Sequence, residues 1–170
     1  MNETIEQYTQ RILAHAQDQD PLKVQAATPK KLERMVKGVS TAKLRKRPAP
    51  ETWSIAEIIA HLADVEIVVA WRMRAILGAP GTDVQAYDQN VWVIAGHYDK
   101  RNLRKDLIQQ RVLREANLAL LKTLTPSQWK QFGMHSERGQ ESIERIALMV
   151  AGHDLNHIQQ IERIVSAKKR

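Results

Sequence analysis

The fold is decided by the stretch Gly152-His153-Asp154-Leu155-Asn156-His157-Ile158-Gln159-Gln160-Ile161. It places two imidazoles four residues apart in a helical pattern. In an α-helix this spacing puts both rings on one face, about one turn (~5.4 Å) apart, so that they could share one metal ion. Polar rings in a stripe that points into a helix bundle need partners, and a metal would satisfy both at once. The apolar members of the stripe are Ile143, Ile146, Val150, Ile161 and Ile164.

The composition favours one well-cored helical domain covering residues 1–170. The chain has 170 residues, of which 43% are hydrophobic, and this length is short for two domains. It contains no cysteine, which excludes disulfides, thiolate ligands and a cysteine nucleophile. The first residues are acidic and no apolar run is long enough to cross a membrane. We therefore expect a soluble, cytoplasmic protein that has no membrane partner.

The net charge of +7 makes nucleic acid worth considering as a partner. Much of the excess lies in residues 30–47, where no aromatic residue is interleaved to stack on bases. A solvated basic flank is therefore favoured, and nucleic-acid binding through residues 30–47 is the remote alternative.

Helical periodicity and capping signals predict four long helices. The clearest start is Ser54-Ile55-Ala56-Glu57, a capping box in which the serine and glutamate satisfy free backbone N–H groups. Thr28-Pro29 is typical of an N-cap followed by proline at the first helical position, and predicts a shorter helix ending at Gly38. No strand alternation of useful length is visible. The long helices are expected at about residues 3–17, 55–77, 103–124 and 141–167.

These helices predict an all-α fold, namely a four-helix bundle. The connection of residues 79–101, between the second and third long helices, is too long for a simple hairpin. Such a crossover can traverse the bundle and join parallel helices, which predicts an up-down-down-up path.

Three histidines are candidates for one metal site: His61 from the second long helix, and His153 with His157 from the last. Catalytic zinc sites commonly use three protein ligands and leave one position open, and nickel and ferrous iron also accept imidazole. A zincin is excluded because that motif needs glutamate after its first histidine, where this chain has Asp154. Two alternatives stay open: a chance histidine pair, and a His61 that is a satisfied core residue.

Four stretches resemble the DinB-like (DinB/YfiT) superfamily of metal-binding four-helix bundles. They are Trp53-Ser54-Ile55-Ala56-Glu57, His61-Leu62-Ala63-Asp64-Val65-Glu66, Tyr87-Asp88-Gln89-Asn90-Val91-Trp92 and Gly152-His153-Asp154-Leu155-Asn156-His157. The resemblance covers about residues 20–165. It implies an up-down-down-up bundle, a divalent metal held by His61, His153 and His157, and a plausible homodimer. The superfamily includes thiol-dependent transferases and a related maleylpyruvate isomerase.

The sequence therefore predicts a divalent-metal-dependent enzyme that acts on a small molecule. An open three-histidine metal can lower the pKa of bound water or bind a thiol as thiolate, and without cysteine the thiol must be external, of low molecular weight. We expect a thiol-dependent S-transferase or a hydrolase-like activity; the alternative is a non-catalytic metal-binding or structural bundle.

Three further side chains bear on the predicted site. Asp88, in a crossover that would lie over the open position, and Asp64, three residues after His61, are the catalytic candidates. His135 is left out of the ligand set, because at ~1.5 Å rise per residue the start of the last helix lies about 20 Å from His153 unless the loop folds back.

Overall fold

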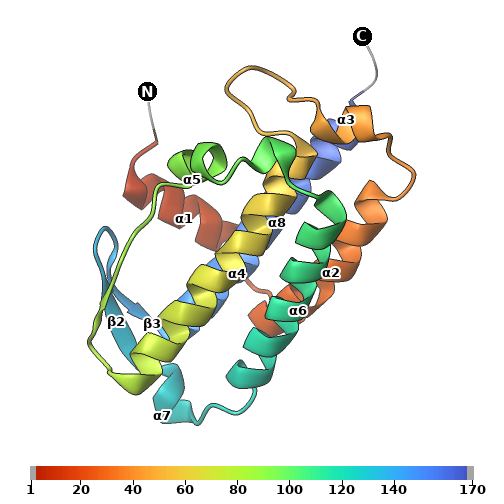
Figure 1. Ribbon diagram of the computed structural model, residues 1–170. Coiled ribbons are helices and arrows are strands. Elements are labelled where there is room, and N and C mark those ends of the chain that lie inside the picture. Colours follow the sequence, from red (N-terminus) through yellow and green to blue (C-terminus); the bar gives the residue numbers. More distant parts are fainter. Residues whose placement is uncertain (1–2, 168–170) are drawn as a thin grey trace.

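The computed structural model describes residues 3–167, and four long helices form its bundle (Figure 1). The predicted all-α class and four-helix bundle are confirmed. None of the helices in this part of the chain has the length and apolar character that crossing a bilayer requires. The long helices are α2 (Pro21–Val36), α4 (Ile55–Gly78), α6 (Leu103–Leu121) and α8 (Ile143–Ser166). The shorter ones are α1 (Ile5–His15), α3 (Thr41–Arg45), α5 (Gln89–Ala95), the 3-10 turn η1 (Tyr98–Lys100) and α7 (Pro126–Trp129).

The contacts between long helices fix their relative directions. Gln109 of α6 donates to the carbonyl of Ala63 in α4, and further along both helices Arg74 donates to Asn117, so α4 and α6 are parallel. The crossover carries the chain back from the end of α4 to the start of α6 (Figure 1). By the same reasoning α2 and α8 are parallel to each other, because Gln25 bonds the Ala147 carbonyl and a later α2 residue, Lys31, pairs with Glu162.

Helix α2 begins earlier than the sequence predicted, and the predicted start at Pro29 is wrong. The first of the four long helices is therefore this helix of 16 residues and not the predicted one at residues 3–17, where α1 has only 11 residues. Asp20 caps the helix, Pro21 takes its first position, and Pro29 lies inside it. A proline has no N–H to donate to the carbonyl four residues before it, so the Gln25 carbonyl lacks its helical partner. Arg114 of α6 donates to that oxygen instead, at 3.1 Å. The internal proline therefore creates an acceptor that a neighbouring helix uses.

A small sheet, which the sequence did not predict, lies beside the lower end of α4 in Figure 1. Strand β1 (Asp83–Val84) pairs in parallel with β2 (Phe132–His135), which pairs antiparallel with β3 (Gly139–Ser142). Strands this short show no readable two-residue period. Gly133 lets β2 approach α4 closely, because a Cβ there would lie 3.0 Å from the Ile76 side chain. The β2–β3 hairpin thus folds back onto the bundle.

Two large apolar clusters lie along the bundle, and a third, small one joins Ala60 to Val93 and Tyr98. One contains the second half of α4 and the first half of α8, around Val69, Met73 and Ile146. The other contains the first half of α4 and the second half of α8, around Ile58 and Ile161. The three candidate histidines, together with Glu66 of α4 and Asp154 of α8, are buried polar residues that occupy the level between these two clusters. Apolar packing above and below therefore holds this polar level in place.

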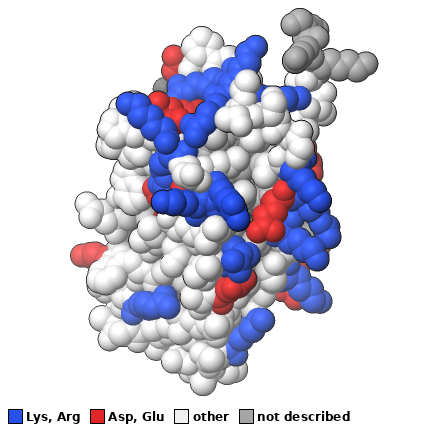
Figure 2. All heavy atoms as spheres, turned by 45° about the vertical axis from the view of Figure 1, so that its right-hand side comes forward, with Lys and Arg blue, Asp and Glu red and all other residues white. Residues whose placement is uncertain are grey.

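Four of the eight basic residues in the stretch 30–47, namely Lys31, Lys43, Arg45 and Arg47, make polar contacts within the protein. Lys43 donates to the Val165 carbonyl at 2.6 Å, and Arg47 pairs with the buried Glu57 at 3.0 Å. Figure 2 shows acidic side chains lying among the basic ones on the face it presents. These contacts tie the connection between α2 and α4 to the rest of the molecule.

Candidate metal centre

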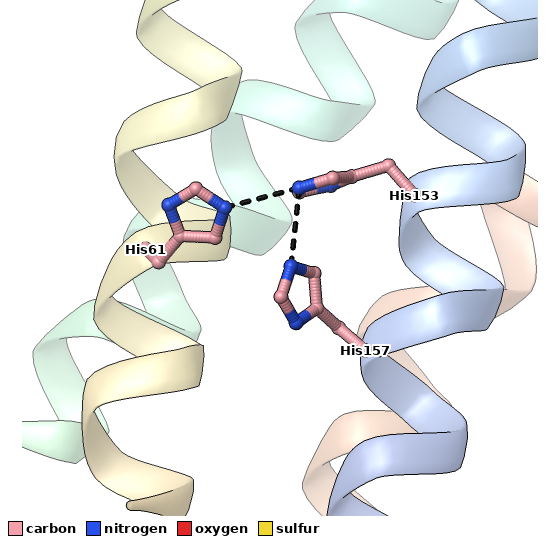
Figure 3. A group of neighbouring side chains, drawn as sticks. All are labelled: His61, His153 and His157. Carbon is pink, nitrogen blue, oxygen red and sulfur yellow. Dashed lines mark hydrogen bonds between the residues drawn. The ribbon is translucent and has the colours of Figure 1, made fainter. Parts of the chain in front are cut away.

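The structure brings His61 of α4 together with His153 and His157 of α8 (Figure 3). The Nε2 atoms of His61 and His153 are 3.0 Å apart, and those of His157 and His153 are 3.1 Å apart. One ring nitrogen of each residue lies within 4.8 Å of the other two. The four-residue spacing in α8 puts two rings on one face, and the antiparallel α4 supplies the third from across the core.

All three rings are buried and neutral. His61, His153 and His157 are only 1%, 9% and 6% exposed, and burial disfavours the charged imidazolium. It lowers the pKa of His157 to about 4 and takes the pKa values of His61 and His153 well below the ordinary value. Each ring therefore keeps a nitrogen lone pair, which is what a metal ligand needs.

The hydrogen bonding of the rings fits a bound cation. The amide oxygen of Gln160 lies 3.0 Å from His157 Nδ1 and accepts its proton, so His157 Nε2 carries the lone pair. His153 Nε2 faces two other Nε2 atoms but holds at most one proton, and therefore satisfies at most one of them. A cation at the centre would accept lone pairs from all three. Among residues 3–167, the group of potential ligands consists of these three imidazoles, which leaves a coordination position open.

Trp53 covers one side of the cluster. It precedes Ser54, whose capping box with Glu57 begins α4, so the start of the helix fixes its position. Its ring is nearly parallel to that of His157, at 8° and 6.2 Å between centroids, and lies 4.9 Å from the His61 ring. The indole therefore restricts the orientation of both imidazoles and excludes water on that side.

A second buried polar cluster lies directly behind the histidines, and sequence reasoning missed it. Arg114, 1% exposed, donates to Glu66 at 2.9 Å and to Asp154 at 3.0 Å, and Asn117 donates to Glu66 at 3.0 Å. Burial opposes the charge of Arg114, but the two carboxylates raise its pKa above the ordinary value. The sequence signal was available: charged residues recur at buried positions of three helices.

A cavity of about 110 Å³ adjoins His153. His135 is left out of the predicted ligand set on the ground of distance unless its loop folds back; the β2–β3 hairpin does fold back, and it places His135 in the cavity wall. His135 is nevertheless not part of the three-histidine group. The lining also includes Tyr8, Val65, Val69, Arg72, Tyr87, Arg138, Glu141, Ile146, Met149 and Val150.

The two predicted catalytic carboxylates have other partners. Asp88 is exposed and caps α5, accepting from the N–H groups of Asn90 and Val91. Asp64 accepts from Arg101 at 2.8 Å and from the Tyr98 hydroxyl at 2.7 Å. Their catalytic roles stay predictions, and the contacts account for both side chains structurally.

An all-helical bundle with a buried cluster of three imidazoles belongs to the class of proteins that carry metal sites in a bundle core. Residues 26–161 match the DinB superfamily, and the chain belongs to that superfamily. The predicted family is thereby confirmed.

Two curated relatives are similar over most of their length. "Putative metal-dependent hydrolase BH0277" of Halalkalibacterium halodurans is 23% identical over 141 residues, covering 83% of this chain and 82% of that protein. "Putative metal-dependent hydrolase OB0413" of Oceanobacillus iheyensis is 23% identical over 136 residues, covering 80% and 78%.

A solved structure shares the fold. YfiT from Bacillus subtilis, described as "a probable metal-dependent hydrolase with an unusual four-helix bundle topology", superposes with a TM-score of 0.75 at 23% identity. The match covers 84% of each chain.

Proposed function

We propose that this protein is a divalent-metal-dependent hydrolase that acts on a small molecule. The observation that carries the proposal is the convergence of three neutral imidazoles, from two helices, beside a cavity. Two relatives that cover most of the chain are named metal-dependent hydrolases, which supports the same reaction class. His61, His153 and His157 would hold the ion. Because all three ligand atoms are imidazole nitrogens, the ion would be zinc, nickel or ferrous iron.

A divalent ion on three imidazoles supplies Lewis acidity and a water of lowered pKa. The protein's own residues would orient and shield the site. Gln160 holds the His157 ring in the tautomer that offers Nε2, and Trp53 covers the cluster on one side. The cavity next to His153 leaves room for a substrate of a few heavy atoms.

The finer alternative is a transferase in which a low-molecular-weight thiol replaces water as the nucleophile. This chain has no cysteine, so the sulfur must come from a second substrate. Both reactions would use the same three histidines, and the identity of the product separates them.

The test begins with metal analysis of protein purified without a histidine tag. We expect close to one equivalent of a divalent metal, bound or restored by reconstitution, and less than about 0.2 equivalents after both steps would overturn the proposal. Small esters, amides and alkyl halides are then tested with and without added cysteine as the thiol. Hydrolysis products that form without added thiol, and that the His153→Leu variant does not form, identify a hydrolase. Products that gain the thiol identify a transferase.

A further inference from the structure

Two side chains that line the cavity beside His153 each carry a buried N–H group that has no hydrogen-bond partner among residues 3–167. They are Nε of Arg72, from α4, and Nε2 of His135, from β2. Arg72 is 8% exposed and His135 is 3% exposed. Leaving a buried donor unpaired costs about 1–3 kcal/mol, so two of them in one cavity wall indicate a missing acceptor.

The protonation of His135 follows from its contacts. Its Nδ1 accepts from the backbone N–H groups of Glu137 at 3.2 Å and Arg138 at 3.4 Å, so the neutral ring carries its hydrogen on Nε2. Burial, together with the charges of Arg138 and Arg72, lowers the pKa of His135 to about 4. At neutral pH the ring is therefore a hydrogen-bond donor that carries no charge.

The charges in the cavity wall leave Arg72 without a counter-ion. Arg138 forms a two-point ion pair with the buried Glu141, at 2.7 and 2.8 Å, so these two charges compensate each other. Arg72 donates only to a backbone carbonyl, that of Gln85, at 2.6 Å, and has no ion pair among residues 3–167. Glu137 also lies at the cavity but is exposed to solvent. Water could accept from the two unpaired donors, but it would not neutralise a buried guanidinium.

We propose that this cavity binds a carboxylate group of the substrate, with the N–H groups of Arg72 and His135 donating to its oxygens. The inference rests on the proposed function, because it assigns the substrate of that site. The guanidinium of Arg72 lies 5.9 Å from the centre of the Tyr87 ring but has no ion pair among residues 3–167, and its single charge matches a carboxylate better than the double charge of phosphate. Val69, Ile146 and Val150 supply an apolar part of the wall, so the substrate is a small carboxylic acid whose hydrocarbon part extends toward His153.

Propionate and propionamide are matched probes, because they have the same shape and differ in charge. The measurement is made on metal-free protein, so that an ion cannot bind the probe. Titration of ¹⁵N-labelled protein with propionate should shift the resonances of Arg72 Nε and His135 Nε2 and saturate at millimolar concentration. Propionamide should bind at least ten-fold more weakly, because charge-assisted hydrogen bonds are the stronger ones.

Two variants and one control localise the binding. Arg72→Met removes the charge, and His135→Asn keeps an acceptor near the Nδ1 position but has no group at Nε2; each should weaken propionate binding by about ten-fold or more. Arg74→Met removes an exposed arginine two residues along the same helix and should leave the affinity unchanged. If Arg72→Met does not fold, Arg72→Lys keeps the charge and loses the Nε donor, and a weakened affinity is expected there too.

The inference is overturned if the two probes bind equally, if phosphate binds more tightly than propionate, or if the Arg72 and His135 resonances do not move. Failure of the proposed function has a different signature. In that case the protein holds no divalent metal, whatever the result with propionate.

Discussion

His153 and Asp154 are neighbours on α8, yet they belong to two buried polar clusters of opposite kinds. In the cluster of Asp154, Glu66 and Arg114, every charged group has a partner of opposite charge within the protein. In the cluster of His153 and its adjoining cavity, one buried nitrogen each of His153, His135 and Arg72 has no hydrogen-bond partner in the described part of the chain, residues 3–167. Both clusters lie between the same two apolar regions of the core, so burial alone does not distinguish them.

The difference separates a structural cluster from a binding site. A network whose members are all satisfied joins helices and has no capacity left for a ligand. Atoms that are buried, polar and unsatisfied lower stability unless something else binds to them. The Arg114 cluster therefore joins α4, α6 and α8, whereas the histidine cluster and its cavity keep unpaired polar atoms for the proposed metal and substrate.

The largest expected effect comes from breaking the satisfied cluster. Arg114→Met leaves two buried carboxylates without a counter-charge and should lower the free energy of unfolding by about 3–5 kcal/mol. Urea denaturation measures this change in the free energy of unfolding. The control is Arg111→Met, which removes an exposed pair with Glu115 and should cost less than about 1 kcal/mol. A loss of stability below about 1 kcal/mol for Arg114→Met would contradict the structural role assigned to the Arg114 cluster.

Replacing a histidine of the three-histidine cluster should instead change stability little and metal affinity strongly. His153→Leu removes a buried Nδ1 that has no hydrogen-bond partner among residues 3–167, which offsets the hydrogen bond lost at Nε2, so the stability of the metal-free protein should change by less than about 1 kcal/mol. Metal affinity should fall by more than about 100-fold, because one of three ligands is gone. Equilibrium dialysis with metal analysis measures the affinity. Full metal retention by this variant would remove His153 from the site.

A smaller effect is expected from the residue that orients a ligand. Gln160→Leu removes the acceptor for His157 Nδ1 and should weaken metal binding by about 10–100-fold. Gln159→Leu, one position earlier in α8, is the matched control and should bind metal as tightly as the parent protein. Equal affinities of the two variants would contradict a role for Gln160 in orienting His157.

The smallest effect is a change in pH dependence. The unfolded chain protonates His135 near its ordinary pKa of 6.5, whereas the folded protein does so only near 4. Between these values the unfolded state binds more protons, so the free energy of unfolding falls as the pH falls from 6.5 to 4. Each such group contributes a slope of up to about 1.4 kcal/mol per pH unit. Denaturation of metal-free protein from pH 7 to 4.5 should show a shallower decline for His135→Asn, and identical slopes would refute the assignment.

The sequence predicted the bundle and the three histidines because both depend on helical periodicity. The steps of three and four that placed His153 and His157 on the buried face of α8 are local, and so is the capping box that begins α4. The prediction for α2 was wrong because Asp20-Pro21 and Thr28-Pro29 are both good start signals, and only packing against Arg114 makes Pro29 acceptable inside the helix.

The cavity could not be predicted because it depends on contacts between distant segments. His135 reaches the region of His153 only because β2 pairs with β1, a strand of two residues about fifty positions earlier in the chain. The partnership of Arg114 with Glu66 and Asp154 likewise joins three helices, and no spacing within one helix reveals it. Local patterns thus identified the three candidate ligands, and the tertiary fold supplied the residues around them.

Pro29 and Arg114 are 85 positions apart, yet the proline depends on the arginine. A carbonyl oxygen can accept two hydrogen bonds, so an amide at position 29 would bond the Gln25 oxygen beside the guanidinium, whereas without the guanidinium the proline leaves that oxygen unbonded. Natural variants of this chain should therefore replace Pro29 while keeping Arg114 more often than they replace Arg114 while keeping Pro29.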